Sequence, residues 1–127
     1  MVSRRRTSFV AVVDDDASVR DAILGLLQSC DIAARGFSSA ERFLKSQRRF
    51  QAACLVLDMR LPGMTGLELL RALQGRGLHI PTIVSTSDAD FDEHLRQQLL
   101  QAGAVAVLGK PFDTEVFLGL VATQLKA

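Results

Sequence analysis

Residues 9–27 read FVAVVDDDASVRDAILGLL, and the pattern in this stretch indicates the fold class. It begins with a run of apolar residues, Phe9–Val13, that is typical of a short strand buried on both faces. Three aspartates follow this run. Val19, Ile23 and Leu27 then recur with helical spacing, with polar side chains on the other face. The pattern predicts a buried strand, an acidic loop and an amphipathic helix in succession.

The same alternation continues along the rest of the chain. Four further apolar runs have the length of buried strands: Ile32–Phe37, Ala53–Leu57, Ile80–Val84 and Ala104–Leu108. Strands that alternate with helices in this way form a parallel sheet with right-handed crossovers and helices on both faces. We therefore predict an α/β fold, a single doubly wound (βα)5 domain with a parallel five-stranded sheet.

Capping signals predict where the helices begin and end. Two stretches, Ser38–Glu41 and Thr65–Glu68, fit the capping box S/T-x-x-E. Acidic residues near a helix start suit the positive end of its dipole, and glycines often terminate helices. The acids expected at helix starts are Asp90, Asp92, Glu93 and Asp113, and the glycines expected at helix ends are Gly75, Gly77 and Gly103.

The composition argues against several classes of protein. The chain has 127 residues, of which 48% are apolar, with 15 basic and 14 acidic side chains. This near balance argues against a disordered acidic tail and against a nucleic-acid binder that works by bulk charge. The apolar runs are too short to span a membrane. We expect neither direct nucleic-acid binding nor membrane association of this domain.

The cysteines and the first residues carry two further expectations. Cys30 and Cys54 lie in apolar surroundings without metal-ligand spacing, so we interpret them as reduced core residues of a cytoplasmic protein. Residues 1–8 include Arg4–Arg6 and no signal-peptide core. We predict that they form a basic, flexible tail ahead of a domain that spans residues 9–127.

Polar side chains follow several of the predicted strands. Asp14–Asp16 follow the first strand, Asp58 the third, Ser85–Ser87 the fourth and Lys110 the fifth. Ligands of doubly wound sheets bind at the carboxyl ends of the strands, so we expect these residues to share one edge. Crowded carboxylates repel one another and lose solvation, and a hard cation such as Mg²⁺ relieves both effects.

Such a cluster also suits phosphoryl transfer. An aspartate beside Mg²⁺ and a lysine is a usable nucleophile for a phosphoryl group, and a threonine hydroxyl can donate to one of its oxygens. Taken singly, each residue has an ordinary role: Asp16 as a helix cap, Thr86 as a turn hydroxyl and Lys110 as a solvated lysine. Their coincidence at one edge favours the functional interpretation.

The same residues resemble the receiver domain of bacterial two-component response regulators. The matching motifs occur in family order from about Phe9 to the end of the chain: Val12–Asp16, Leu57–Gly66, Ile83–Thr86 and Lys110–Phe112. The loop in Leu57–Gly66 is similar to that of regulators with a helix-turn-helix output domain. The resemblance implies a flavodoxin-like fold with strand order 2-1-3-4-5.

The resemblance implies a phosphoacceptor and a metal site. Asp58 is expected to take a phosphoryl group from a sensor histidine kinase or a phosphotransfer protein. Asp15 is expected to ligate Mg²⁺ directly and Asp14 to hold a metal-bound water. Asp58 and the backbone carbonyl of Arg60 would complete the protein's share of the ligands.

The resemblance further implies how the site signals. Thr86 is expected to move toward the phosphoryl group, and Lys110 is expected to pair with it. The Lys110–Pro111 peptide bond is expected to be cis. The domain would catalyse only its own phosphorylation and dephosphorylation and would not be a turnover enzyme. Its other expected partners are a downstream protein or a DNA-binding output domain, and a second copy of the chain after phosphorylation.

Three alternative functions remain open at this point. An aspartate-nucleophile phosphohydrolase would need a second aspartate two residues after the nucleophile, where Arg60 stands. A flavin binder of flavodoxin type would have its phosphate repelled by the three aspartates after the first strand. The third is a receiver-like module that signals by interaction without phosphorylation, because Val107 stands where the family usually places Tyr or Phe.

Overall fold

The computed structural model describes residues 8–87 and 92–126 and has the predicted α/β architecture. Its five strands are all parallel, in the order β2-β1-β3-β4-β5. The elements are β1 (Phe9–Val13), α2 (Ala17–Ser29), β2 (Ala34–Phe37), α3 (Ala40–Lys45), the 3-10 turn η1 (Arg49–Gln51), β3 (Ala52–Asp58), α4 (Gly66–Gly75), β4 (Thr82–Thr86), α5 (Glu93–Gln101), β5 (Ala104–Gly109) and α6 (Thr114–Lys126). The doubly wound fold and the strand order are therefore confirmed.

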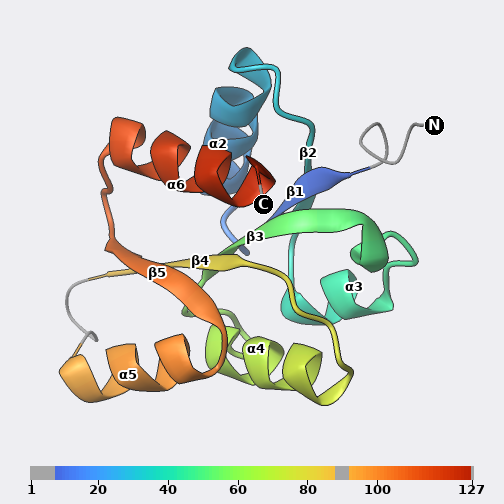
Figure 1. The fold of residues 1–127 in the computed structure, drawn as a ribbon, viewed down its shortest axis with the longest axis vertical. Coiled ribbons are helices and arrows are strands. Elements are labelled where there is room, and N and C mark those ends of the chain that lie inside the picture. Colours follow the sequence, from blue (N-terminus) through green and yellow to red (C-terminus); the bar gives the residue numbers. More distant parts are fainter. Residues whose placement is uncertain (1–7, 88–91, 127) are drawn as a thin grey trace.

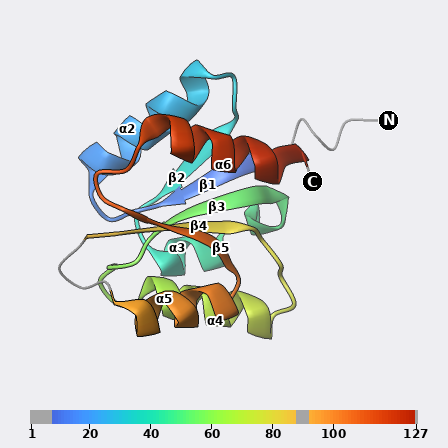
Figure 2. The ribbon, with the colours of Figure 1, turned by 60° about the vertical axis from the view of Figure 1, so that its left-hand side comes forward.

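Helices cover the sheet on both faces (Figures 1 and 2). Helices α2 and α6 lie on one face, and α3, α4 and α5 lie on the other. Val10 and Val12 of β1 face α2 and α6, whereas Ala11 and Val13 belong to the core on the opposite face. Because both faces are covered, all five residues of β1 are buried. This explains why the strand reads as a continuous apolar run.

The strand boundaries differ from the sequence prediction at β2 and β4. Strand β2 begins at Ala34, two residues after the predicted start at Ile32. The Ile32 amide instead donates to the carbonyl of Leu27 at the end of α2. The predicted strand Ile80–Val84 lies two residues further on, at Thr82–Thr86. Proline has no backbone N–H for a sheet, which is consistent with β4 beginning just after Pro81.

The predicted capping box at Thr65–Glu68 is confirmed. The Thr65 hydroxyl accepts from the Glu68 amide at 3.2 Å, and the Glu68 carboxylate accepts from the Thr65 amide at 2.8 Å. The box predicted at Ser38–Glu41 is wrong, because Ser39 is the cap of α3 and its hydroxyl accepts from the Arg42 amide.

The other predicted helix ends agree with the structure where it describes them. Asp92 caps α5 and Asp113 accepts from the amide of Val116 in the first turn of α6. Gly77 and Gly103, with φ of +71° and +112°, follow the last turns of α4 and α5. Asp90, which is also predicted at a helix start, lies outside the described residues.

Cys54 and Cys30 have different environments. Cys54 is fully buried in β3, as expected, but Cys30 at the end of α2 is exposed, so its assignment to the core is wrong. The predicted tail lies outside the described residues except for Ser8. Among the helices that the structure describes, none is long and apolar enough to cross a membrane.

Candidate functional site

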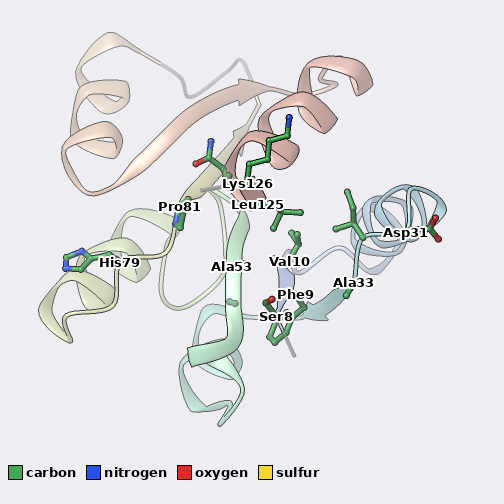
Figure 3. Close-up of a pocket in the computed structure, with 13 residues that line it drawn as sticks. Ser8, Phe9, Val10, Asp31, Ala33, Ala53, His79, Pro81, Leu125 and Lys126 are labelled. Atoms are coloured by element: carbon green, nitrogen blue, oxygen red, sulfur yellow. The ribbon is translucent and has the colours of Figure 1, made fainter. Parts of the chain in front are cut away.

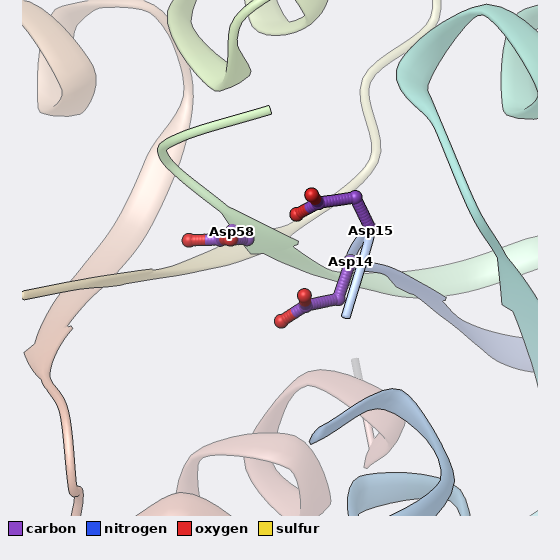
Figure 4. A group of neighbouring side chains, drawn as sticks. All are labelled: Asp14, Asp15 and Asp58. Carbon is purple, nitrogen blue, oxygen red and sulfur yellow. The ribbon is translucent and has the colours of Figure 1, made fainter. Parts of the chain in front are cut away.

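Four strands bring the predicted site residues to the same edge of the sheet. Asp14 follows β1, Asp58 ends β3, Thr86 ends β4 and Lys110 follows β5. Figure 4 shows the side chains of Asp14, Asp15 and Asp58 pointing to the same side, with one carboxylate oxygen of each within 4.8 Å of the others. The site predicted from the strand ends is thus assembled by the parallel topology.

Asp14 is buried, with 2% of its surface exposed, and is held from several directions. Its Oδ1 accepts from the Asp16 amide at 2.9 Å, and its Oδ2 lies 3.5 Å from Nζ of Lys110. The guanidinium of Arg20 donates to the Asp14 carbonyl oxygen at 2.8 Å. These contacts fix both the backbone and the carboxylate of Asp14.

Asp58 is also buried, and Lys110 is its charged partner. Oδ1 of Asp58 lies 3.2 Å from Nζ of Lys110 and accepts from the Arg60 amide at 3.3 Å. Burial raises the pKa of the Asp58 carboxyl, and the neighbouring charge of Asp14 raises it further. Lys110 and the Arg60 amide act in the opposite direction without cancelling the effect of burial. The ionised site therefore holds negative charge that its own lysine only partly offsets.

The donor set suits a hard divalent cation. Three carboxylates converge, and Asp15 is exposed, so a cation can enter from solvent while keeping some of its water. Mg²⁺ prefers oxygen ligands and is commonly held by one or two carboxylates together with water. A bound cation would also offset the charge that burial disfavours at Asp58. The residues present therefore fit a magnesium site.

Thr86 lies at the site, but its hydroxyl is turned to the backbone. Thr86 is buried, and its Oγ1 donates to the Ser87 carbonyl at 3.2 Å. The Lys110 amide donates to the Thr86 carbonyl at 2.7 Å, which ties the ends of β4 and β5 together. The Lys110–Pro111 peptide bond is cis, as predicted.

Three residues support the site through contacts that the sequence analysis does not predict. Arg20 fixes the Asp14 carbonyl, as described above. Gly66 lies so close to the end of β3 that a Cβ there would stand 3.0 Å from the Asp58 carbonyl oxygen. Glu41 accepts from the Met64 amide at 2.9 Å and so holds the loop between β3 and α4. Each contact joins residues that lie in different elements or loops, and it depends on how these segments pack together.

A hollow of about 870 Å³ lies at the opposite edge, beside the starts of β1 and β3 and the end of α6 (Figure 3). Its lining includes one carboxylate, Asp31, and one imidazole, His79, which lie on opposite sides of the view. These groups do not converge as the carboxylates do at the carboxyl edge.

Comparison with known proteins decides the family. Residues 10–122 match the family described as response regulator receiver domain. The chain belongs to this family. The family proposed from the sequence motifs is thus confirmed, and a receiver domain implies phosphoacceptor signalling in a two-component system.

Curated relatives of this receiver are transcriptional and response regulators. The transcriptional regulatory protein FixJ of Azorhizobium caulinodans is 38% identical over 116 residues, which cover 91% of this chain and 54% of the relative. The response regulator protein TodT of Pseudomonas putida is 36% identical over 121 residues, covering 95% of this chain and 52% of the relative. This receiver therefore spans about half the length of the curated relatives it matches.

Solved structures agree with the fold of this receiver. The response regulator StyR is 38% identical, with a TM-score of 0.84 over 94% of this chain and 59% of that chain. The structure of FixJ-N is 31% identical, with a TM-score of 0.80 over 99% of this chain and 96% of that one.

Proposed function

We propose that this receiver, spanning residues 9–127, is a switch that accepts a phosphoryl group on Asp58 in a magnesium-dependent reaction. The donor would be the phosphohistidine of a sensor histidine kinase or a phosphotransfer protein. The observation that carries the proposal is the convergence of three carboxylates within 4.8 Å, with Nζ of Lys110 3.2 Å from Asp58. This combination joins a nucleophile, a cation site and a fixed ammonium group.

In the proposed reaction, an Asp58 carboxylate oxygen bonds to phosphorus and the bond from phosphorus to the donor histidine nitrogen breaks. Lys110 would pair with the oxygens of the transferring group, which carry its negative charge. Asp14, Asp15 and Asp58, together with the Arg60 carbonyl, would hold Mg²⁺, which when bound neutralises charge on these oxygens. The acceptor aspartate returns to its starting state when the acyl phosphate is hydrolysed.

Thr86 is the proposed link to the surface. Its hydroxyl donates to the Ser87 carbonyl at 3.2 Å, and a phosphoryl oxygen on Asp58 would compete for this donor. A change of partner would release the backbone at the end of β4 and favour a second conformation around α5, β5 and α6. Val107 of β5 is partly buried against the core beside α4 and α5. The change at Thr86 would therefore reach the surface without an aromatic side chain at position 107.

The proposed partners follow from a switch of this kind. Besides the kinase, they are a downstream protein or a DNA-binding output domain, and a second copy of the chain after phosphorylation. The receiver would act only on its own acyl phosphate and not turn over other substrates. A cytoplasmic location stays a prediction from the sequence.

Labelling with a small phosphodonor tests the acceptor residue. Acetyl phosphate with Mg²⁺ should add one phosphoryl group to the wild-type protein, measured by intact mass, and a chelator should prevent the addition. The Asp58→Asn variant should take up none. Asp16→Asn is the matched control, because Asp16 belongs to the same acidic run but caps α2 through the Ser18 and Val19 amides. Equal labelling of Asp58→Asn and wild type would show that Asp58 is not the acceptor.

The same labelled sample separates the switch from an interaction module that works without phosphorylation. Amide chemical shifts in α5, β5 and α6 should change when the wild type is phosphorylated. Shifts confined to the residues around Asp58 would instead favour the interaction module.

A further inference from the structure

Arg20, which contacts the Asp14 carbonyl of the acidic site, also lines a separate hollow. The hollow has a volume of about 690 Å³ and lies between the start of α2, the end of β2 and α3. Three cationic side chains line it, Arg20, Arg42 and Lys45, together with the hydroxyl residues Ser38 and Ser46. The volume is in the range of pockets for small molecules, about 300–1,000 Å³.

The cations of this hollow form no ion pair within the part of the chain that the structure describes. The lining contains no carboxylate. Ion pairs between described residues join Lys110 to Asp14 and Asp58, and none involves these three cations. Glu41 of α3 interacts electrostatically with Lys45, but its carboxylate accepts its hydrogen bond from the Met64 amide. The hollow is therefore lined by three positive charges, none of which forms an ion pair with a described residue.

The position of Arg20 is set before any ligand arrives. Its guanidinium donates to the Asp14 carbonyl at 2.8 Å, and its aliphatic stem lies across Gly36. A Cβ at Gly36 would stand 3.0 Å from Cδ and 3.2 Å from Cγ of Arg20, so glycine leaves room for this stem. A fixed guanidinium loses little freedom when it binds an anion, which favours binding.

We propose that this hollow binds the phosphate group of a small anionic ligand. Guanidinium groups match phosphate with paired hydrogen bonds, a lysine adds a mobile charge, and serine hydroxyls donate further hydrogen bonds. The phosphate could belong to free pyrophosphate or to a nucleotide. The base of a nucleotide would contact the partly buried ring of Phe37, which lines the hollow. The site is distinct from the acidic pocket, which repels anions in the absence of a cation.

Amide chemical shifts of the full chain test this inference without Mg²⁺. Inorganic pyrophosphate and, in a separate titration, ADP are added in the presence of a chelator. The amides of Gly36, Ser38 and Ser46 should shift in a saturable way. Tighter binding of ADP would identify a nucleotide as the ligand, and equal affinities would identify the phosphate group alone. Because Mg²⁺ is absent, phosphorylation of Asp58 plays no part in the result.

A pair of variants distinguishes specific binding in the hollow from general electrostatic attraction to the surface. The double variant Arg42→Gln/Lys45→Gln removes two exposed cations of α3 and should weaken binding by about tenfold or more, because charge-assisted hydrogen bonds are lost. The control Arg71→Gln/Lys126→Gln loses the same charge elsewhere on the surface and should bind as the wild type does. Equal weakening in both variants, shifts that sodium chloride of the same ionic strength reproduces, or no shifts at these amides would overturn the inference.

Discussion

At the scale of single residues, Asp58 carries its charge where the fold disfavours it. Burial raises its pKa, Asp14 adds to this effect, and the single ammonium of Lys110 is shared between the two carboxylates at 3.5 and 3.2 Å. A reactive nucleophile and a binding site for a cation both need negative charge that is not fully paired. The same arrangement therefore supports both roles proposed for Asp58, as phosphoacceptor and as metal ligand.

Gly66 is predicted to be needed for the geometry of the loop that follows Asp58. An alanine Cβ would stand 3.0 Å from the Asp58 carbonyl oxygen and 3.1 Å from Cα of Met59, both of which are backbone atoms. Gly66→Ala should destabilise the protein by about 1–3 kcal/mol in urea unfolding and slow labelling by acetyl phosphate. Gly75→Ala, in the same helix with open space around it, should be neutral or stabilising by about 0.5 kcal/mol. Similar losses in both variants would argue against a role for the close approach.

Cys54 and Cys30 should differ in reactivity. Burial raises the pKa of the Cys54 thiol to about 11, so almost no thiolate forms at pH 8, whereas Cys30 is exposed. In the native protein Cys30 should react with a thiol reagent at least about tenfold faster than Cys54, and both should react after unfolding. The fast phase should vanish in Cys30→Ser. Two equally fast phases in the native protein would contradict the burial of Cys54.

At the scale of elements, Glu41 connects α3 to the loop between β3 and α4. Hydrogen bonds from its own amide and from the Met64 amide lower the pKa of the Glu41 carboxyl below its usual value of 4.5. A lowered pKa means that the contact stabilises the fold above pH 4.5 and that this contribution is lost as the pH falls through the folded-state pKa. Glu41→Gln should therefore be less stable than wild type at pH 7, and the difference should shrink in acid.

Urea unfolding at several pH values measures this effect, and hydrogen exchange at Met64 measures the local contact. Exchange of the Met64 amide should speed up in Glu41→Gln. The control Glu115→Gln changes an exposed glutamate in the first turn of α6 and should leave both measurements unchanged. An unchanged Met64 exchange rate in Glu41→Gln would show that the contact contributes nothing.

The elements themselves could largely be predicted from sequence, and their exact ends less well. The runs at β1 and β5 and the cap at Thr65 were predicted because local periodicity and local hydrogen bonds decide them. The end of β4 was missed because it contains Ser85 and Thr86, which are polar yet buried at the site. The sequence places Glu41 in a local capping box, but its hydrogen-bond partner is the amide of Met64, which is 23 residues away.

At the scale of the whole molecule, cation binding should stabilise the fold. Mg²⁺ bound only by the folded state would raise the unfolding free energy by about 1.4 kcal/mol at ten times its dissociation constant. Thermal unfolding should therefore shift upward with Mg²⁺ in the wild type and much less in Asp15→Asn. The shift should persist in Asp31→Asn, which removes an exposed acid outside the cluster. Equal shifts in the wild type and Asp15→Asn would place the cation elsewhere.

The near-neutral charge of the chain conceals an uneven distribution. Carboxylates gather after β1 and β3, and the hollow with Arg20, Arg42 and Lys45 lies next to them at the end of β2. The formal net charge of +1 reports only their sum. Arg20 belongs to both regions, because it contacts the Asp14 carbonyl and lines the hollow.

The sequence by itself determined the fold class and the residues of the candidate site, because buried parallel strands read as apolar runs and their ends share one edge. Only the tertiary structure decided how these residues are held. The shared ammonium of Lys110, the contact of Glu41 with Met64 and the cationic hollow each join segments distant in sequence, and the close approach of Gly66 joins the start of α4 to the end of β3. Such contacts depend on how the helices pack against the sheet, and the local periodicity of the sequence does not determine that packing.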